Sequence, residues 1–546
     1  MNDVRKGALM LTKTPGELLA SAWKRIPPVM KVTFFAAFAS GLLVHMFMFT
    51  NTLVNYDVIY YLISKMEGEI AGRWFAFFPD LISGTFNLPW MNGLLATLYL
   101  SLSACLVVSV LKIKDYLSSA LIAALMVVTP SAAAIFCFIH SADVTFFGLL
   151  LACLAVYAAQ KWKFGAIPAV VLVVLSLGIY QTWLGMCAGL MILVLIVDVL
   201  QNFDSVKKTI LRGLKYFSVL VVGLGIYYLI TKLLAPPQGL MSYMGLDQMG
   251  HIPLADIPFL VFRAYVKLAK YFLVNSRGFH YPFMGVFFAL AGIAGCYLLV
   301  RWCRRHTMKL GQLATLALLL VLFPLGCNII YVATPGIVHD LMVYPTILVP
   351  ILLLMLISMH ISQSKADETD QEAASVPPPI KQKLAPIMEV VSLWLVVGVT
   401  LLTVFNYGIV ANKAYTKLTI AYEQAYAQSV GLTTRVQGVE GYKQTTPVVL
   451  VGRYNVGNSD HRPTIPEMDD FKLTGASSGD NLLFHYSYDI YLTRYLGFPN
   501  PMTYLYDGVL EDPVIAAELK QLPRYPDDGS IVVIDEVIYV HLSYPQ

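Results

Sequence analysis

The chain contains repeated runs of close to twenty residues that carry no charged side chain. A helix needs about 20 mainly apolar residues to cross the hydrocarbon layer of a bilayer, which is about 30 Å thick. The composition agrees, because 57% of the 546 residues are hydrophobic and only 13% are charged. Ordinary soluble domains carry about a quarter charged residues. We therefore expect an α-helical polytopic membrane protein.

The lengths of the apolar runs predict eleven transmembrane helices. They lie near residues 32–50, 90–110, 117–138, 143–160, 166–182, 184–200, 216–235, 282–300, 311–333, 341–361 and 389–410. Lysine and arginine gather in every second connection, as the positive-inside rule requires if residues 1–31 are a cytoplasmic segment. That segment has too short an apolar run for a secretory signal. In this topology the transmembrane domain covers 32–410, and its loops 51–89 and 236–281 face outward.

The composition becomes that of a soluble protein after Val410. "ANKAYTKLTIAYEQAYAQSVG" and "DPVIAAELKQLP" are typical of helices, while "TPVVLVGRYN" and "GSIVVIDEVIYVHL" are typical of β-strands. We expect residues 411–546 to form a small α/β domain. An odd number of spans places this domain in the periplasm if the membrane is the bacterial inner membrane.

Several function classes lack their usual motifs. The seven cysteines lie in or beside apolar segments without a CxxC pair, so we expect small buried hydrophobic residues rather than a redox or metal site. The chain has no GxGxxG or P-loop motif. We therefore expect no cofactor and no nucleic acid partner, and nothing in the sequence supports a divalent metal.

The first outer loop gathers acids in a chain that is otherwise poor in charge. Asp57 follows the first span, and Glu67, Glu69 and Arg73 come shortly after it. One interpretation is a solvated loop, because charge runs usually are solvated. The other is a functional site, because ionisable groups at membrane depth are costly. The chemistry that fits is group transfer, in which a carboxylate takes the proton of an attacking hydroxyl and cations stabilise a phosphate leaving group.

A basic helix is predicted in the second long outer loop, within "FRAYVKLAKYFLVNSRGFHYP". The spacing of Arg263, Lys267 and Lys270 puts them on one face, opposite an apolar face that includes Phe262, and Arg277 follows. This face can bind lipid headgroups in general. Alternatively, it binds the phosphate of a lipid-linked donor, as arginine and lysine commonly do.

Four short motifs resemble those of the glucosyltransferase family II membrane proteins. They are Gly72-Arg73-Trp74, Pro130-Ser131, Ala142-Asp143 and Gly178-Ile179-Tyr180-Gln181. Members of this family modify the O-antigen of lipopolysaccharide and so convert serotype. The resemblance covers roughly residues 40–350 and leaves the C-terminal third without a counterpart.

The resemblance implies a GT-C glycosyltransferase fold and a sugar donor linked to polyprenyl phosphate. It also implies an acid of the first outer loop as the general base, and Asp57 is the first candidate. The family pattern has two adjacent acids, whereas Val58 follows Asp57 here, so Glu67 or Glu69 can share the role. Arg73 matches the family arginine, either organising these carboxylates or contacting the donor phosphate.

Further polar residues near the outer ends of spans are candidates for substrate contacts: Trp74, His140, Asp143, Tyr180, Gln181 and His339. Alternative interpretations exist for several of them. Asp143 can cap the start of the fourth span, and Trp74 and Tyr180 can belong to an interfacial aromatic belt. His45 is expected to be an interior, hydrogen-bonded histidine.

Together these observations predict an inverting glucosyltransferase of the bacterial inner membrane. It would move glucose from undecaprenyl phosphate to an O-antigen acceptor, among membrane lipids and with donor-synthase and flippase partners. The alternatives are a transporter or flippase of lipid-linked sugars, an O-antigen ligase or polymerase, and a non-enzymatic scaffold.

Overall fold

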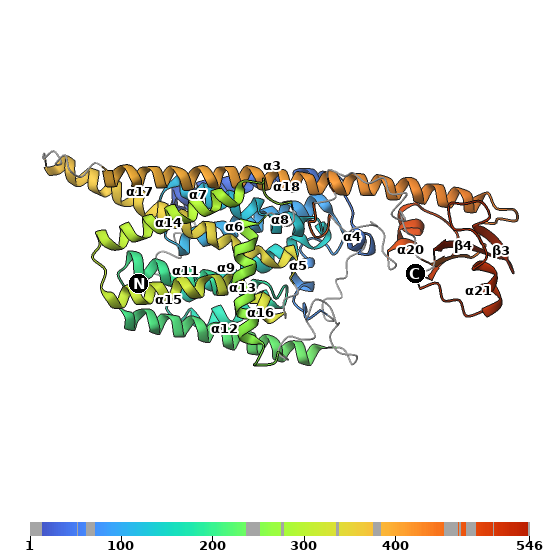
Figure 1. The fold of residues 1–546 in the computed structure, drawn as a ribbon, viewed down its shortest axis with the longest axis horizontal. Helices are drawn as coiled ribbons and strands as arrows, with labels where there is room; N and C mark the ends of the chain where they lie inside the picture. Colours follow the sequence, from blue (N-terminus) through green and yellow to red (C-terminus); the bar gives the residue numbers. More distant parts are fainter. Residues whose placement is uncertain are drawn as a thin grey trace.

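The chain folds into a bundle of long helices with a small β-sheet at one end (Figure 1). This computed structural model describes residues 14–51, 53–61, 71–235, 252–274, 278–334, 338–374, 384–452, 468, 471–476, 487–505 and 507–543. An amphipathic helix, α2 (Pro15–Arg25), precedes the bundle.

The predicted spans correspond to helices. These are α3 (Pro28–Thr50), α6 (Pro89–Val110), α7 (Tyr116–Val128) with α8 (Pro130–Phe136), α9 (Ile139–Lys161), α10 (Ala166–Leu177), α11 (Trp183–Gln201), α12 (Val206–Leu234), α14 (Met284–Arg305), α15 (Leu310–Cys327), η1 (Asp340–Ile347) with α17 (Leu348–Ala374), and α18 (Leu384–Gln437). Within the described ranges, nine helices are long and apolar enough to cross a membrane, and the bent pair α7–α8 makes up to ten. The remaining predicted span, 166–182, contains only the 12-residue helix α10. At 1.5 Å per residue, α10 is too short to cross a bilayer alone.

A proline explains the bend between α7 and α8. Thr129 adopts an extended backbone (φ −53°, ψ 145°) directly before Pro130. A residue before proline is pushed out of the helical region, and proline itself donates no backbone hydrogen bond. The two helices therefore meet at 46°. A second break follows at Cys137 and Phe138, before α9 begins.

The predicted basic connections lie together at one end of the bundle, here called the basic end. Asp198 of α11 pairs with Lys112 (2.9 Å) and with Arg212 of α12. Arg212 also pairs with Asp204 (3.1 Å). These ion pairs join the connections that follow α6 and α11. The opposite end, here called the site end, carries the short helices α4 (Tyr56–Tyr60) and α5 (Phe77–Asp80).

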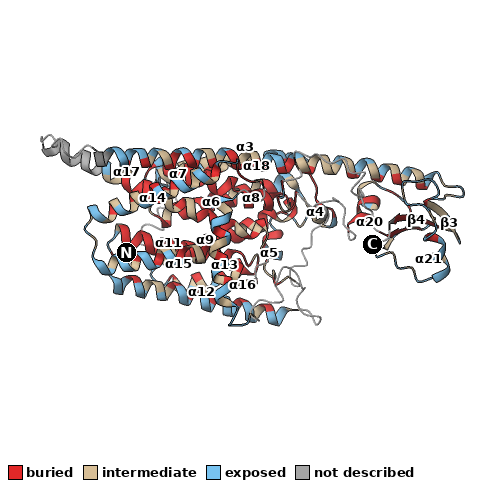
Figure 2. Ribbon diagram, in the orientation of Figure 1, coloured by how far each residue is buried: buried red, intermediate tan, exposed pale blue. Residues whose placement is uncertain are grey.

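Burial is greatest in the middle of the bundle, where α6, α8, α9 and α11 pack together (Figure 2). Close contact between α3 and α6 depends on Gly93, because a Cβ there would lie 2.3 Å from the Phe49 ring. His45 is fully buried, as predicted, and its ring nitrogens contact the Tyr415 hydroxyl and the Val127 carbonyl.

Helix α18 continues without a break from the bundle to the C-terminal region, along one edge of the molecule (Figure 1). The boundary expected at residue 411 thus falls inside one 54-residue helix. Beyond it lie β1 (Val448–Gly452), α20 (Tyr488–Ile490), η3 (Tyr491–Tyr495), β2 (Met502–Leu505), α21 (Pro513–Leu519), β3 (Ile531–Ile534) and β4 (Val537–Ser543).

The sheet has the order β2-β1-β4-β3. Strand β1 runs parallel to β2 and β4, and β3 pairs antiparallel with β4. The predicted strands are therefore present, and β2 is an additional one. Three further elements are α13 (Ile257–Leu273), α16 (Ile329–Ala333) and the start of η1, all near the site end.

Replacing Asp198 with Asn is expected to destabilise the protein, because Lys112 loses its carboxylate partner and Arg212 keeps only Asp204. Breaking a buried ion pair costs about 3–5 kcal/mol, and the partial exposure of both cations lowers our expectation to about 2 kcal/mol. Thermal unfolding of the solubilised protein measures this change. Glu511→Gln, at an exposed position, is the control, and equal unfolding temperatures for the two variants would contradict the structural role.

Candidate functional site at one end of the bundle

Asp57 is held in place by the residue two positions before it. The Asn55 side chain is fully buried and accepts hydrogen bonds from the backbone N–H groups of Asp57 (3.1 Å) and Val58 (3.0 Å). Its amide also donates to the Cys137 carbonyl (2.8 Å), at the break between α8 and α9. Asn55 is thus an N-cap for α4, and it fixes the half-buried Asp57 against the bundle.

His140 lies beside this short helix. Its ring stacks on Tyr61, the residue that ends α4, with ring centroids 5.3 Å apart and an angle of 16°. The Asn92 amide contacts the backbone carbonyls of Ile139 (3.2 Å) and His140 (3.3 Å). The start of α9 is therefore tied to α6 and faces the chain segment that carries Asp57.

Two of the family-like motifs form one hydrogen-bonded unit, although they lie about 110 residues apart. The Gln181 amide donates to the Ala71 carbonyl (2.9 Å) and to the Tyr227 hydroxyl (2.8 Å), which donates to the Gly72 carbonyl (3.1 Å). The Phe75 N–H donates to the Gly178 carbonyl (2.8 Å). Gln181, predicted to contact substrate, therefore positions the loop that presents Arg73.

Arg73 is the cation of this unit. Its guanidinium lies over the Tyr180 ring, 4.9 Å from the centroid, which is a favourable cation–π distance. It is also close enough to His140 to interact with it electrostatically. Tyr180 therefore supports Arg73.

A pair of buried carboxylates lies at the same end. The interpretation of Asp143 as a helix cap is wrong, because α9 begins at Ile139 with Phe138 in the cap position. Asp143 instead points into the bundle, almost completely buried, where it interacts with Ser83 and with Asp80 of α5. Sequence reasoning missed Asp80. Its signal was a carboxylate in the apolar stretch "FAFFPDLI".

Several buried polar atoms at the site end have no hydrogen-bond partner among the described residues. They are Arg73 Nε, Trp74 Nε1, Asn92 Oδ1, His140 Nδ1 and Asp143 Oδ1. A buried polar atom without a partner costs about 1–3 kcal/mol. Such atoms are rare in native proteins and call for a water or a ligand. A sugar supplies hydroxyl groups that both donate and accept, so this donor and acceptor set suits a sugar.

The basic face predicted in the second outer loop is present on α13. Arg263, Lys267 and Lys270 are all exposed, and α13 runs across the long helices rather than along them (Figure 1). Of the predicted apolar face, Leu268 is buried and Phe262 is exposed. The residues buried against the bundle are spaced four apart: Leu260, Ala264 and Leu268.

The C-terminal region reaches back to the site end through residues 471–476, here called the strap. Thr474 donates from its N–H and its hydroxyl to Asp340, both at 2.8 Å. Gly475 (φ +89°) sits so close to Phe138 that a Cβ would lie 2.7 Å from the ring. His339 precedes Asp340 at the start of η1, next to the residue that anchors the strap.

Three predicted site residues, Glu67, Glu69 and Arg277, lie outside the described residues.

Among the described residues of the site end, burial and the nearby Asp340 carboxylate raise the pKa of Tyr271 on α13 to about 12. Tyr271 therefore keeps its proton at neutral pH. Across the described ranges, no group of three or more His, Cys, Asp or Glu side chains is arranged to hold a metal ion.

Gly72→Ala is expected to destabilise the unit that presents Arg73. A Cβ at Gly72 would lie 2.8 Å from the Tyr227 hydroxyl and 3.2 Å from the Gln181 amide, and overpacking costs about 1–3 kcal/mol. Gly84→Ala is the matched control, because Gly84 has a similar positive φ (+85°, against +68°) but nothing within 4 Å. The unfolding temperature should fall further for Gly72→Ala than for Gly84→Ala. Equal decreases in the two variants would show that strain of the left-handed backbone alone is responsible.

Comparison with known proteins agrees with this arrangement. The chain matches the family model "Glucosyl transferase GtrII" over residues 46–357, more than half of its length. No curated protein and no solved structure matches it. The matched range includes Asp57, Arg73, His140 and the hydrogen-bonded unit of Gly72 and Gln181. The chain therefore belongs to the Glucosyl transferase GtrII family and is a membrane glycosyltransferase.

Proposed function

We propose that this protein transfers glucose from a polyprenyl-phosphate donor to O-antigen, with inversion at the anomeric carbon. The family supports the transfer of glucose. The donor, the acceptor and the inversion are inferred from the unpartnered buried polar atoms around Arg73 and His140. These atoms lie close to a carboxylate that follows the first span. A ligand rich in hydroxyl groups would satisfy these atoms.

In this proposal Asp57 acts as the general base. An acceptor hydroxyl loses its proton to Asp57 as its oxygen attacks the anomeric carbon from one face. The bond from that carbon to the phosphate oxygen breaks on the opposite face, and its electron pair leaves with the lipid phosphate. Glu67 and Glu69 belong to the same loop and are candidates to share the proton or to orient the acceptor.

The leaving phosphate needs positive charge where its negative charge develops. Arg73 is suited to this role, because Tyr180 and the neighbouring backbone contacts fix its position before the donor arrives. The exposed cations of α13 form a second basic surface at the same end, and Arg277 follows them in the sequence. We assign them to binding the phosphate of the approaching donor at the membrane surface.

The remaining candidates surround the reacting sugar in this account. His140 and Asp143 each offer an unpartnered buried atom, and Trp74 offers its indole N–H. Gln181 positions the loop that presents Arg73. His339 lies next to Asp340, which anchors the strap. The strap brings the C-terminal region to this end, so that region is well placed to bind the polysaccharide acceptor.

The proposed orientation follows the charges of the connections. The basic end would face the cytoplasm of the bacterial inner membrane, and the site end with the C-terminal region would face the periplasm. The donor must then be made and moved across the membrane by other proteins. This assigns the chain a donor-synthase and a flippase as partners in the pathway.

Asp57→Asn is expected to lower glucose transfer by about 100- to 10,000-fold, the usual contribution of a general base. The measurement is transfer of labelled glucose from a synthetic polyprenyl-phosphate donor in proteoliposomes. Glu423→Gln, at an exposed position of α18, controls for the loss of a carboxylate. Wild-type activity in Asp57→Asn protein with normal thermal stability would remove Asp57 as the base.

Replacing Arg263, Lys267 and Lys270 together with Gln is expected to raise the KM for the donor by about tenfold, and the KM for the acceptor far less. Each basic residue near an anionic surface contributes about 1 kcal/mol to the binding free energy. The exposure of these three side chains lowers the contribution that we expect from each. Replacing Lys161, Lys207 and Lys309, three exposed lysines at the basic end, is the matched control. If both triple variants use the donor equally well, α13 does not bind the donor phosphate.

A further inference from the structure

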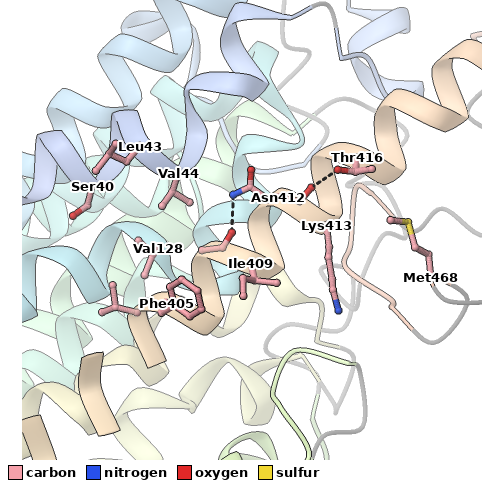
Figure 3. A pocket seen from close by; sticks show the side chains of 12 residues that line it. Ser40, Leu43, Val44, Val128, Phe405, Ile409, Asn412, Lys413, Thr416 and Met468 are labelled. Carbon is pink, nitrogen blue, oxygen red and sulfur yellow. Dashed lines mark hydrogen bonds between the residues drawn. The ribbon is translucent and has the colours of Figure 1, made fainter. Parts of the chain in front are cut away.

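A groove lies on the outside of the bundle. It has a volume of about 610 Å³ and runs between α3 and α18, with α7 behind it and Met468 at one end (Figure 3). Its walls are mainly apolar, with Val44, Val128 and Phe405 among them. Leu43 is 85% exposed and Phe405 65% exposed, on helices long and apolar enough to cross a membrane. The groove therefore opens towards lipid.

Gly408 keeps the groove open. A Cβ at this position would meet only Val44, at 3.7 Å, which is ordinary van der Waals contact. A larger side chain at Gly408 would consequently extend into the groove without disturbing the backbone. Because residue 408 has no side chain, the groove stays open beside Val44 and Phe405.

One cation lies at the end of the groove near Met468. Lys413 is exposed, and no ion pair or hydrogen bond of its side chain occurs within the described part of the chain (Figure 3). Lys417, one turn further along α18, is already committed, because it donates to the carbonyls of Met468 (3.3 Å) and Phe471 (3.1 Å). Lys413 is thus available to a phosphate at the depth of the lipid headgroups.

A buried layer lies behind the groove. His45 and Tyr415 are hydrogen-bonded (2.6 Å) and fully buried, and the His45 ring stacks on Phe136 with centroids 4.2 Å apart. His45 and Tyr415 are the chain neighbours of Val44 and Thr416, which line the groove. Buried side chains therefore lie directly behind this part of the groove wall.

We propose that the groove binds an anionic phospholipid of the surrounding bilayer. One acyl chain lies along Val44, Phe405 and Gly408, and the phosphate binds Lys413. The charge of Lys413 selects an anionic headgroup, and the buried layer behind the groove argues against a reacting substrate. Such a lipid would fasten α3 to α18 and contact Met468, whose carbonyl shares the Lys417 ammonium with that of Phe471 in the strap. It would thereby stabilise the docking of the C-terminal region. This inference does not depend on the proposed function.

The test uses the full chain in nanodiscs of phosphatidylcholine, alone or with phosphatidylglycerol. Native mass spectrometry measures the retained lipid, and thermal unfolding measures its effect on stability. We expect the wild type to retain phosphatidylglycerol preferentially and to be more stable with it. Lys413→Gln should weaken this preference about fivefold, the effect of one cation near a lipid surface. Lys413→Arg should keep it.

Gly408→Leu should abolish the preferential retention by filling the groove. Gly398→Leu is its matched control, because Gly398 lies on the same helix with nothing within 4 Å. Equal retention by these two variants, or no lipid preference in the wild type, would overturn the proposal. Displacement of phosphatidylglycerol by polyprenyl phosphate at lower concentration would also overturn it, since the groove would then be a substrate site.

Discussion

The hydrocarbon layer of a membrane offers no partner to a polar group, and the structure follows from this constraint. Helices satisfy their own backbone there, so the chain crosses as helices and its charges move to the two ends. The two ends then differ. At the basic end, Asp198 and Asp204 are each paired with cations. At the site end, buried polar atoms of Arg73, His140 and Asp143 lack partners among the described residues. The paired carboxylates join neighbouring helices at the basic end, and the atoms of the site end are those that we propose to contact the substrate.

The breaks on either side of α8 connect the parts of the site end. Pro130 ends α7, and the chain breaks again at Cys137, whose carbonyl accepts from Asn55. The same turn receives Gly475 of the strap, because glycine has no side chain to clash with Phe138. One irregular stretch of backbone thus contacts both the segment that carries Asp57 and the C-terminal region. In the proposed function, this stretch would bring the base of the first loop and an acceptor-binding C-terminal region to one site.

The sequence predicted the helices and the types of residue in the site better than it predicted which residues each of them contacts. Apolar run length is a strong signal, and each predicted span contains a helix, although α10 is too short to cross a bilayer alone. The basic face of α13 followed from simple helical spacing. Burial partners are set by packing between segments far apart, which no local pattern encodes. For that reason the sequence did not show that Gln181 holds Gly72 through Tyr227, or that Asp143 meets Asp80 instead of capping a helix. The continuity of α18 past residue 411 was also hidden, because the change in composition marks the membrane surface and not the end of a helix.

The central claim is that the site end receives a lipid-linked sugar with its anomeric carbon next to Asp57. The most direct measurement is an experimental structure of the protein with a non-reactive polyprenyl-phosphate sugar analogue. The account predicts an acceptor hydroxyl or water about 3 Å from the Asp57 carboxylate, on the face of the sugar opposite the phosphate, with Arg73 contacting that phosphate. A donor bound at the basic end, or a sugar out of reach of Asp57, would contradict it.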